Sequence, residues 1–253
     1  MPLKPKTLIA HRGGVVDAHR SENSFKALNE AIHREYTHIE IDARITADGH
    51  VVCFHNDTLQ EEAGIDGTIS EMPLEAITKT VLTRSGETIP SFYDYCAQCA
   101  DRIGVMIDLK GCPDTFIEAY AQEIETALAD HDLLDDALIL INQTPENNQA
   151  QIANLFLKKS RISWRKSLEE TRTVAQQDPE FISNYYVCNH GDDFSAEEVT
   201  GFQEMGLEVI VSINTGHYKT GNAQQQGEDH IKKMLQHGVD GLQIDSCFDS
   251  LIF

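Results

Sequence analysis

The sequence lacks features that mark several common classes of protein. It has no apolar run of roughly 18 residues, the length that a membrane-spanning helix needs. Basic residues are scarce, since 20 Lys and Arg stand against 41 Asp and Glu, for a formal net charge of −21. A surface of this charge repels the phosphates of nucleic acids. We therefore expect neither nucleic-acid binding nor stable insertion into a membrane.

The cysteines also lack the spacing of a disulfide framework. Six are scattered along the chain, at positions 53, 96, 99, 112, 188 and 247, as is usual in a reducing compartment. Cys96 and Cys99 form the one close pair, and no second pair or histidine at ligand spacing accompanies it to bind zinc. We interpret them as buried thiols one helical turn apart. The first apolar stretch stops at His11-Arg12, which is too short for a signal peptide, so we expect a soluble, cytoplasmic protein.

Short apolar runs alternate with longer amphipathic stretches from one end of the chain to the other. The predicted strands are Thr7–Ala10, His38–Ile45, Val51–His55, Ile103–Lys110, Ala137–Ile141, Arg161–Trp164, Tyr185–Cys188, Leu207–Ile213 and Gly241–Ile244. Helical spacing is clearest over Ser24–Arg34, Asp114–Asp130, Ser195–Met205 and Gln224–His237. Alternating strands and helices are typical of a parallel sheet covered by helices.

The number of these units favours an α/β fold of the TIM (β/α)8 barrel type. Eight units in 253 residues average about 32 residues each, and such barrels contain about 250 residues. The main alternative, an open doubly wound sheet, carries a Gly-rich phosphate loop after its first strand. Here that strand ends in His11-Arg12-Gly13-Gly14 instead. We therefore predict a single barrel domain over residues 1–253, with a small insertion at about 57–91, after the second strand and a hairpin-like addition.

Charged side chains gather at the ends of two predicted strands. Glu40 and Asp42 alternate with isoleucines, and Asp108 and Lys110 alternate with apolar residues in the same way. In a barrel they would point inward at the rim where barrel enzymes build their active sites. Three carboxylates there would suit a hard divalent cation. The alternation is equally compatible with polar positions that face solvent and pair with Arg44 and Lys110.

Two histidines end predicted strands on the same rim. His11 follows the first strand and His55 ends Val51–His55. Because imidazoles titrate near neutral pH, such a pair can serve as general acid and general base. Arg12 offers a forked donor that suits phosphate oxygens. A metal, an arginine and a lysine together suit charge stabilisation in phosphoryl transfer, so the combination predicts that chemistry.

These residues stand in motifs that resemble the glycerophosphodiester phosphodiesterase family. The order and spacing of its N-terminal signature are matched by Leu8-Ile9-Ala10-His11-Arg12-Gly13, Glu22-Asn23-Ser24, Ile39-Glu40-Ile41-Asp42, Thr46-Ala47-Asp48-Gly49 and Val51-Val52-Cys53-Phe54-His55. Later motifs of the family are matched by Ile107-Asp108-Leu109-Lys110 and by Gly238-Val239-Asp240-Gly241 followed by Asp245. The resemblance covers nearly the whole chain, densely over the first sixty residues and thinly afterwards.

The resemblance implies a TIM barrel enzyme that hydrolyses small glycerophosphodiesters to sn-glycerol 3-phosphate and an alcohol, with Mg²⁺ or Ca²⁺ as its divalent cation. Its implied site consists of His11 and His55 as the acid–base pair, Arg12 and Lys110 as phosphate ligands, Glu40, Asp42 and Asp108 as metal ligands, and Glu22 and Asn23 at the rim near the metal and glycerol. Residues 57–91 correspond to the family's insertion, which helps to cover the site.

Some positions depart from the family pattern. Asp108 stands where the family usually has Glu, so this ligand is one methylene shorter and would bind after a small shift or through a water. The family's tryptophan on the seventh strand is absent near Ile213, while Trp164 either lines the pocket or packs in the core. Alternative functions are a related barrel phosphodiesterase that acts on lysophospholipids or forms a cyclic phosphate, and a catalytically silent barrel that binds anions.

Overall fold

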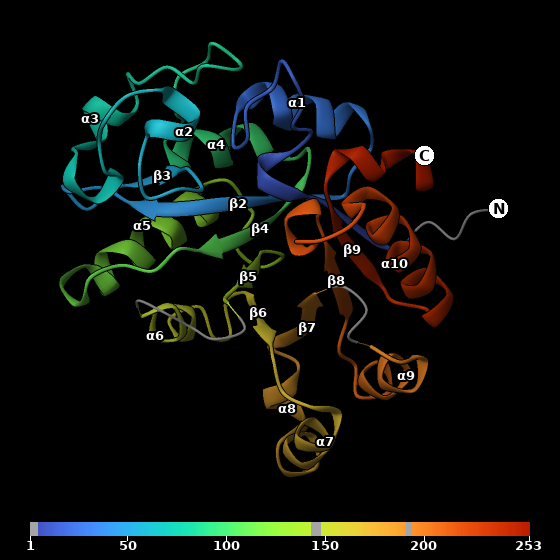
Figure 1. Cartoon of the computed structure of the whole chain (residues 1–253). Helices are drawn as coiled ribbons and strands as arrows, with labels where there is room; N and C mark the ends of the chain where they lie inside the picture. Colours follow the sequence, from blue (N-terminus) through green and yellow to red (C-terminus); the bar gives the residue numbers. More distant parts are fainter. Residues whose placement is uncertain (1–4, 143–147, 191–193) are drawn as a thin grey trace.

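A closed ring of parallel strands forms the centre of the computed structural model, which describes residues 5–142, 148–190 and 194–253. The ring consists of β1 (Thr7–Ala10), β2 (His38–Ile45), β4 (Gly104–Leu109), β5 (Leu138–Leu140), β6 (Arg161–Trp164), β7 (Tyr185–His190), β8 (Val209–Ile213) and β9 (Gly241–Ile244). The strands pair in the order β1-β9-β8-β7-β6-β5-β4-β2, and pairing of β1 with β2 closes the ring. The predicted TIM barrel is therefore confirmed (Figure 1).

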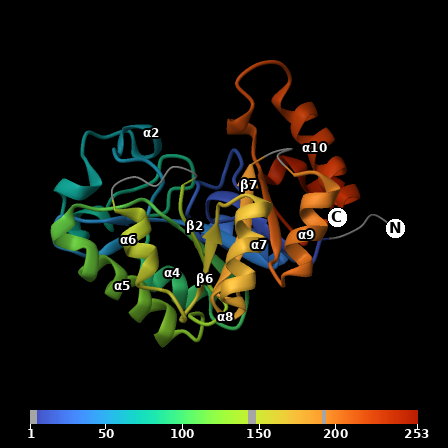
Figure 2. The same cartoon turned by 90° about the horizontal axis from the view of Figure 1, so that it is seen from below.

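Helices cover the outside of this ring (Figure 2). They are α1 (Phe25–His33), α4 (Phe92–Cys99), α5 (Ile117–Asp130), α6 (Gln149–Asn154), α7 (Leu168–Gln177), α8 (Pro179–Ile182), α9 (Ala196–Glu204) and α10 (Ala223–His237). Ser24 and Ser195 cap α1 and α9, because their side chains accept hydrogen bonds from backbone N–H groups of the first turn. Among the described residues, no helix has the length and apolar character needed to cross a membrane.

The segment between the second and third barrel strands forms the predicted addition and insertion. β3 (Val51–Cys53) pairs antiparallel with β2. It leads into short helices, α2 (Gln60–Ala63) and α3 (Leu74–Ile77), which the sequence pattern did not predict because one turn shows no periodicity. The insertion has an apolar cluster of its own, made by Val52, Phe54, Leu59, Ala63, Ile69, Ile77, Leu82 and Ile89.

The interior of the barrel changes from apolar to charged along the strands. A buried cluster fills its inner wall with Ile9, Met106, Leu138, Leu140, Tyr186, Cys188 and Ile210. The charged residues of the predicted site lie nearer the C-terminal ends of the strands, and a separate pair, Arg161 with Glu208, lies at the N-terminal ends. Trp164 is on the outer face, where it packs against Tyr185 and its Nε1 donates to Thr171, so it belongs to the core. Cys96 and Cys99 are free, buried thiols on α4, as predicted.

Candidate active site

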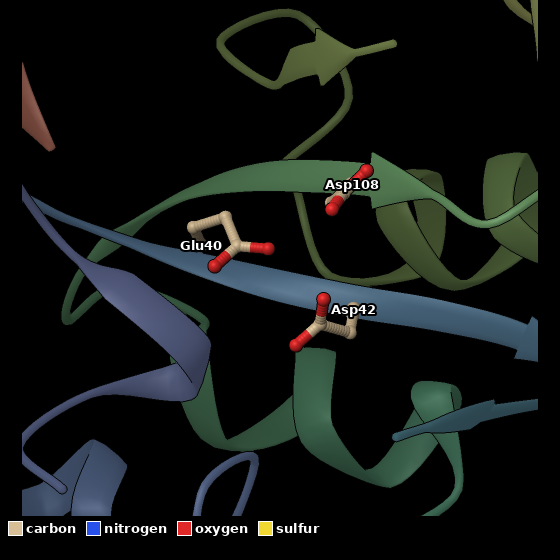
Figure 3. Close-up of side chains that lie close together, drawn as sticks. All are labelled: Glu40, Asp42 and Asp108. Atoms are coloured by element: carbon tan, nitrogen blue, oxygen red, sulfur yellow. The ribbon is translucent and has the colours of Figure 1, made fainter. Parts of the chain in front are cut away.

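Three carboxylates converge inside the barrel from two neighbouring strands. The register of β2 and β4 places Asp42 beside Asp108, and Glu40 lies two residues earlier on β2. One oxygen of each carboxylate lies within 4.8 Å of the others, and Figure 3 shows the three side chains gathered together. Glu40 and Asp42 are each only 1% exposed. The solvent-facing interpretation of this alternation is therefore wrong for β2.

Lys110 partly neutralises this carboxylate cluster. Its Nζ lies 2.6 Å from Asp42 Oδ1 and 2.6 Å from Asp108 Oδ2. Burial raises the pKa of Asp42, but Lys110, His55 and the hydrogen bond from Asn23 together outweigh it, so the pKa of this carboxyl is lowered. For Glu40, burial and the charge of Asp42 raise the pKa to about 8. One ammonium is thus too little positive charge for three carboxylates, of which Glu40 and Asp42 are buried.

A divalent cation fits this oxygen-rich cluster. Asp108 Oδ1 is buried and has no hydrogen-bond partner within the described part of the chain. Such an atom is costly to bury unless something binds it. Mg²⁺ and Ca²⁺ both prefer carboxylate oxygens as ligands. Glu40, Asp42 and Asp108 therefore form a candidate site for a hard cation.

A tight turn after β1 braces the carboxylate cluster. Asn23 donates from Nδ2 to Asp42 Oδ2 at 2.7 Å, and its Oδ1 accepts from the Asp42 N–H at 3.2 Å. The backbone N–H of Arg12 donates to Glu40 Oε2 at 2.7 Å. Gly13 lets the turn approach Asn23, since a Cβ on Gly13 would lie 2.6 Å from the Asn23 Cα. Both β2 carboxylates are therefore held by the segment that follows β1.

His11 is oriented by an aspartate from the other end of the chain. Its Nδ1 lies 2.7 Å from Asp245 Oδ1. The other oxygen of Asp245 accepts from the N–H and the hydroxyl of Thr215, each at 2.7 Å. Burial lowers the pKa of His11, but the hydrogen bond to Asp245 and the charge of Glu40 outweigh it, so the pKa is raised. The imidazole therefore favours its protonated form more than a free histidine does.

The surroundings of His55 lower its pKa, whereas those of His11 raise the pKa of that residue. It follows β3, and its Nε2 lies 3.2 Å from Nη2 of Arg12, while Nδ1 lies 2.9 Å from Asn56 Oδ1. Asn56 Oδ1 can only accept a hydrogen bond, and the guanidinium of Arg12 can only donate one. We therefore assign the proton of His55 to Nδ1 and the lone pair to Nε2. Burial lowers the pKa of His55, and the charges of Lys110 and Arg12 lower it further against the effect of Asp42.

Arg12 connects the parts of the site. It directly follows His11 in the chain, its Nη2 approaches His55, and its Nη1 lies 2.7 Å from Glu22 Oε2. A cavity of about 460 Å³ is lined by His11, Arg12, Glu22, Asn214 and Asp245, among others. The structure places all the predicted site residues at the C-terminal end of the barrel or in the loops beside it: His11, Arg12, Glu22, Asn23, Glu40, Asp42, His55, Asp108 and Lys110.

The sequence analysis did not assign the role of Asp245. The available signal was the barrel order, because the last strand of a closed barrel lies beside the first. Ala10 pairs with Ile244 in the register of β1 and β9, so the residues that follow them, His11 and Asp245, are neighbours. The sequence analysis also gave no role in the site to Arg44. Its guanidinium donates to the His55 carbonyl oxygen from Nε at 2.8 Å and from Nη2 at 2.6 Å.

Comparison with known proteins agrees with this geometry. A family model described as the glycerophosphoryl diester phosphodiesterase family matches residues 11–247. The chain belongs to this family. Relatives include a putative glycerophosphodiester phosphodiesterase, YhdW, of Bacillus subtilis, 29% identical over 112 residues that cover 42% of this chain and 45% of the relative. Human glycerophosphodiester phosphodiesterase 1 is 30% identical over 121 residues, which cover 43% of this chain and 36% of that protein.

These matches span less than half the length of either relative, whereas similar solved structures match almost the whole chain. A glycerophosphoryl diester phosphodiesterase from Parabacteroides distasonis has a TM-score of 0.74 and 18% identity, over 97% of this chain and 85% of the other. A phosphodiesterase from Oleispira antarctica, in complex with the product sn-glycerol 3-phosphate, has a TM-score of 0.71 and 20% identity, over 98% and 95%. At these identities the structural similarity supports the barrel fold.

Proposed function

We propose that this member of the glycerophosphoryl diester phosphodiesterase family hydrolyses glycerophosphodiesters to sn-glycerol 3-phosphate and an alcohol. The observation that carries the proposal is the arrangement of two histidines around Arg12, beside the buried carboxylate cluster. Their pKa values are shifted in opposite directions, as an acid–base pair requires. The product bound to the related phosphodiesterase of Oleispira antarctica supports the same reaction.

Glu40, Asp42 and Asp108 would hold the divalent cation, Mg²⁺ or Ca²⁺, which when bound supplies positive charge to the phosphate oxygens. Lys110 would contribute a further phosphate contact. Its ammonium has three donors, of which the contacts with Asp42 and Asp108 use two. Arg12 keeps a buried Nε with no partner among the described residues, so its guanidinium also has a donor to offer to a phosphate oxygen.

The histidine environments suggest which residue plays which role. Neutral His55 would accept the proton of a water at Nε2 as the water oxygen bonds to phosphorus, with Arg12 Nη2 turned from Nε2 to a phosphate oxygen. Protonated His11, held at Nδ1 by Asp245, would donate its Nε2 proton to the alcohol oxygen as the bond between that oxygen and phosphorus breaks. The water oxygen then remains on the phosphate of sn-glycerol 3-phosphate, and the alcohol leaves with the proton of His11.

The test is hydrolysis of glycerophosphoglycerol and glycerophosphocholine, followed by ³¹P NMR with and without EDTA. We expect sn-glycerol 3-phosphate to form, EDTA to stop the reaction, and MgCl₂ or CaCl₂ to restore it. His11→Ala and His55→Ala should each lower kcat by about 10²- to 10⁴-fold. His33→Ala, an exposed histidine on α1, is the matched control and should keep the wild-type rate. A cyclic phosphate as the final product, or wild-type rates in either site variant, would contradict the proposal.

A further inference from the structure

Besides Arg12, Arg44 and Lys110, a further cationic group, the guanidinium of Arg165, lies at the rim of the barrel. Arg165 directly follows β6, and its Nη2 donates to the carbonyl oxygen of Ile141, after β5, at 2.8 Å. Its Nη1 is 3.5 Å from Oδ1 of Asn189, on β7. Because Arg161 pairs in register with Leu138, which lies in the inner apolar cluster, residues 161, 163 and 165 alternate onto the interior side. Arg165 therefore reaches across the ends of three neighbouring strands.

The environment of Arg165 differs from that of Arg12, Arg44 and Lys110, each of which is paired with a carboxylate. Arg12 is paired with Glu22, and Lys110 is paired with two aspartates. Within residues 5–142, 148–190 and 194–253, Arg165 contacts only neutral oxygens and forms no ion pair with a carboxylate. Its Nε is buried and has no partner within the same residues. A buried donor without an acceptor is costly. An anion would accept a hydrogen bond from the guanidinium of Arg165 and balance its positive charge.

A cavity of about 290 Å³ lies beside Arg165, between the end of β6 and α6. Its polar lining includes Asn142, Asn154 and Ser163, and its apolar lining includes Ile162 and Trp164, which alternate onto the outer face of β6. The charged residues in that lining are Arg165 and Lys166, without any Asp or Glu among the described residues that line it. Lys166 is exposed and lies 4.0 Å from Glu170, so its charge is only loosely paired. Of these two cations, only Arg165 alternates onto the interior side of the barrel, so it is the one that can face a bound substrate.

The position of Arg165 relative to the carboxylate cluster points to the substrate itself. β5 separates β6 from β4, and neighbouring strands lie about 4.8 Å apart, so the rim positions of Lys110 and Arg165 are about 10 Å apart. The side chain of Arg165 leans back toward β5, which shortens this separation. We propose that Arg165 binds a second anionic group, a phosphate or a carboxylate, on the alcohol half of the diester. This inference rests on the proposed phosphodiesterase function and specifies its substrate class.

The experiment compares three water-soluble diesters that share the glycerophosphate half. Bis(glycerophospho)glycerol carries a second phosphate, glycerophosphoserine carries a carboxylate, and glycerophosphoglycerol carries no second anion. We expect Arg165→Gln to lower kcat/KM for one or both anionic substrates by about 10-fold or more, through KM. Glycerophosphoglycerol should change by less than about 3-fold, and Arg165→Lys should recover part of the loss. Arg172→Gln, which removes an exposed guanidinium from α7, is the matched control.

An equal loss for all three substrates, or no loss for any, would overturn the inference. Calorimetric binding to His55→Ala in the presence of CaCl₂ tests the same subsite without turnover. There, bis(glycerophospho)glycerol or glycerophosphoserine should bind more tightly than glycerophosphoglycerol, and Arg165→Gln should abolish the difference. If the wild-type enzyme hydrolyses none of the diesters, the proposed function fails, whereas equal binding with and without Arg165 refutes the subsite alone.

Discussion

His11 Nδ1 and Asp245 Oδ1 lie 2.7 Å apart although 234 positions separate the two residues in the chain. Closure of the barrel makes this contact, because β9 pairs with β1 and each strand ends immediately before one of the two residues. The backbone and hydroxyl of Thr215 hold the other carboxylate oxygen. Asp245 can therefore fix both the orientation and the protonation of the imidazole, in the way that a carboxylate orients a catalytic histidine.

Replacing Asp245 with Asn should lower kcat and change its pH dependence. The hydrogen bond and negative charge of Asp245 raise the pKa of His11, against burial. Asp245→Asn should therefore lower that pKa and move the basic limb of kcat to lower pH, with a loss of about 10-fold or more at pH 8. Asp229→Asn, on the surface of α10, is the control. A lower kcat with an unshifted basic limb would show that Asp245 positions the imidazole of His11 without raising its pKa.

The wild-type enzyme should have a broad, bell-shaped pH profile of kcat/KM. In its proposed role as base, His55 must be neutral, so activity should fall as the pH drops through its pKa, which burial lowers. In its proposed role as acid, His11 must be protonated, so activity should fall as the pH rises through its raised pKa. The plateau should therefore extend to both sides of about pH 6.5, the usual pKa of histidine. A narrow optimum, with the two limbs close together, would be inconsistent with these roles.

Asp108→Asn should weaken binding of a divalent cation. The substitution removes one of three carboxylates and leaves the paired Lys110 charge in place. We expect affinity for Ca²⁺ or Mg²⁺ to fall by about 10-fold or more, measured by calorimetry. The rise in Tm that the cation produces in the wild type should shrink accordingly. Asp135→Asn, an exposed loop residue, controls for the loss of one surface charge. Equal affinities in the three proteins would exclude Asp108 as a ligand.

Gly13→Ala should destabilise the protein more than Gly238→Ala does. Both glycines have positive φ, at 78° and 82°, so alanine is strained at either position. Only at Gly13 would the new Cβ overlap the chain, since nothing lies within 4 Å of one at Gly238. We expect a loss of about 1 kcal/mol for Gly238→Ala and at least about 2 kcal/mol more for Gly13→Ala, from urea unfolding. Similar losses would show that the turn adapts to a methyl group.

We propose that the barrel and the insertion unfold as one unit, as a single domain over residues 1–253 would. The insertion has its own apolar cluster, but Arg44 on β2 pairs with Asp57, and Lys26 on α1 donates to the Ser85 carbonyl at 2.6 Å. Leu59→Ala should therefore lower the free energy of unfolding by about 2–5 kcal/mol in a single transition. Fluorescence of Trp164, the only tryptophan, and proteolysis of the insertion should report the same urea midpoint. Two separate midpoints would indicate independent units.

Local sequence patterns predicted the barrel and placed charged residues at the ends of its strands, whereas the roles of the site residues came from the resemblance to a family. Alternation places Glu40 and Asp42 on one face of β2, and capping residues such as Ser24 and Ser195 mark where helices begin. These signals work because the period of a strand or helix is set by the backbone over a few residues. The four-residue helices α2 and α3 were not predicted, since one turn held by tertiary packing leaves no periodic pattern.

By itself, the sequence determined which residue types stand at the ends of the strands, and so the kind of chemistry that the rim can support. Only the tertiary structure decided how they pair: Asp245 with His11, Lys110 between two aspartates, and Arg165 among neutral oxygens. These contacts join strands that are neighbours in the barrel but distant along the chain. Their charges and pKa values depend on burial and on distances of a few ångströms, and both arise only when the ring of strands closes.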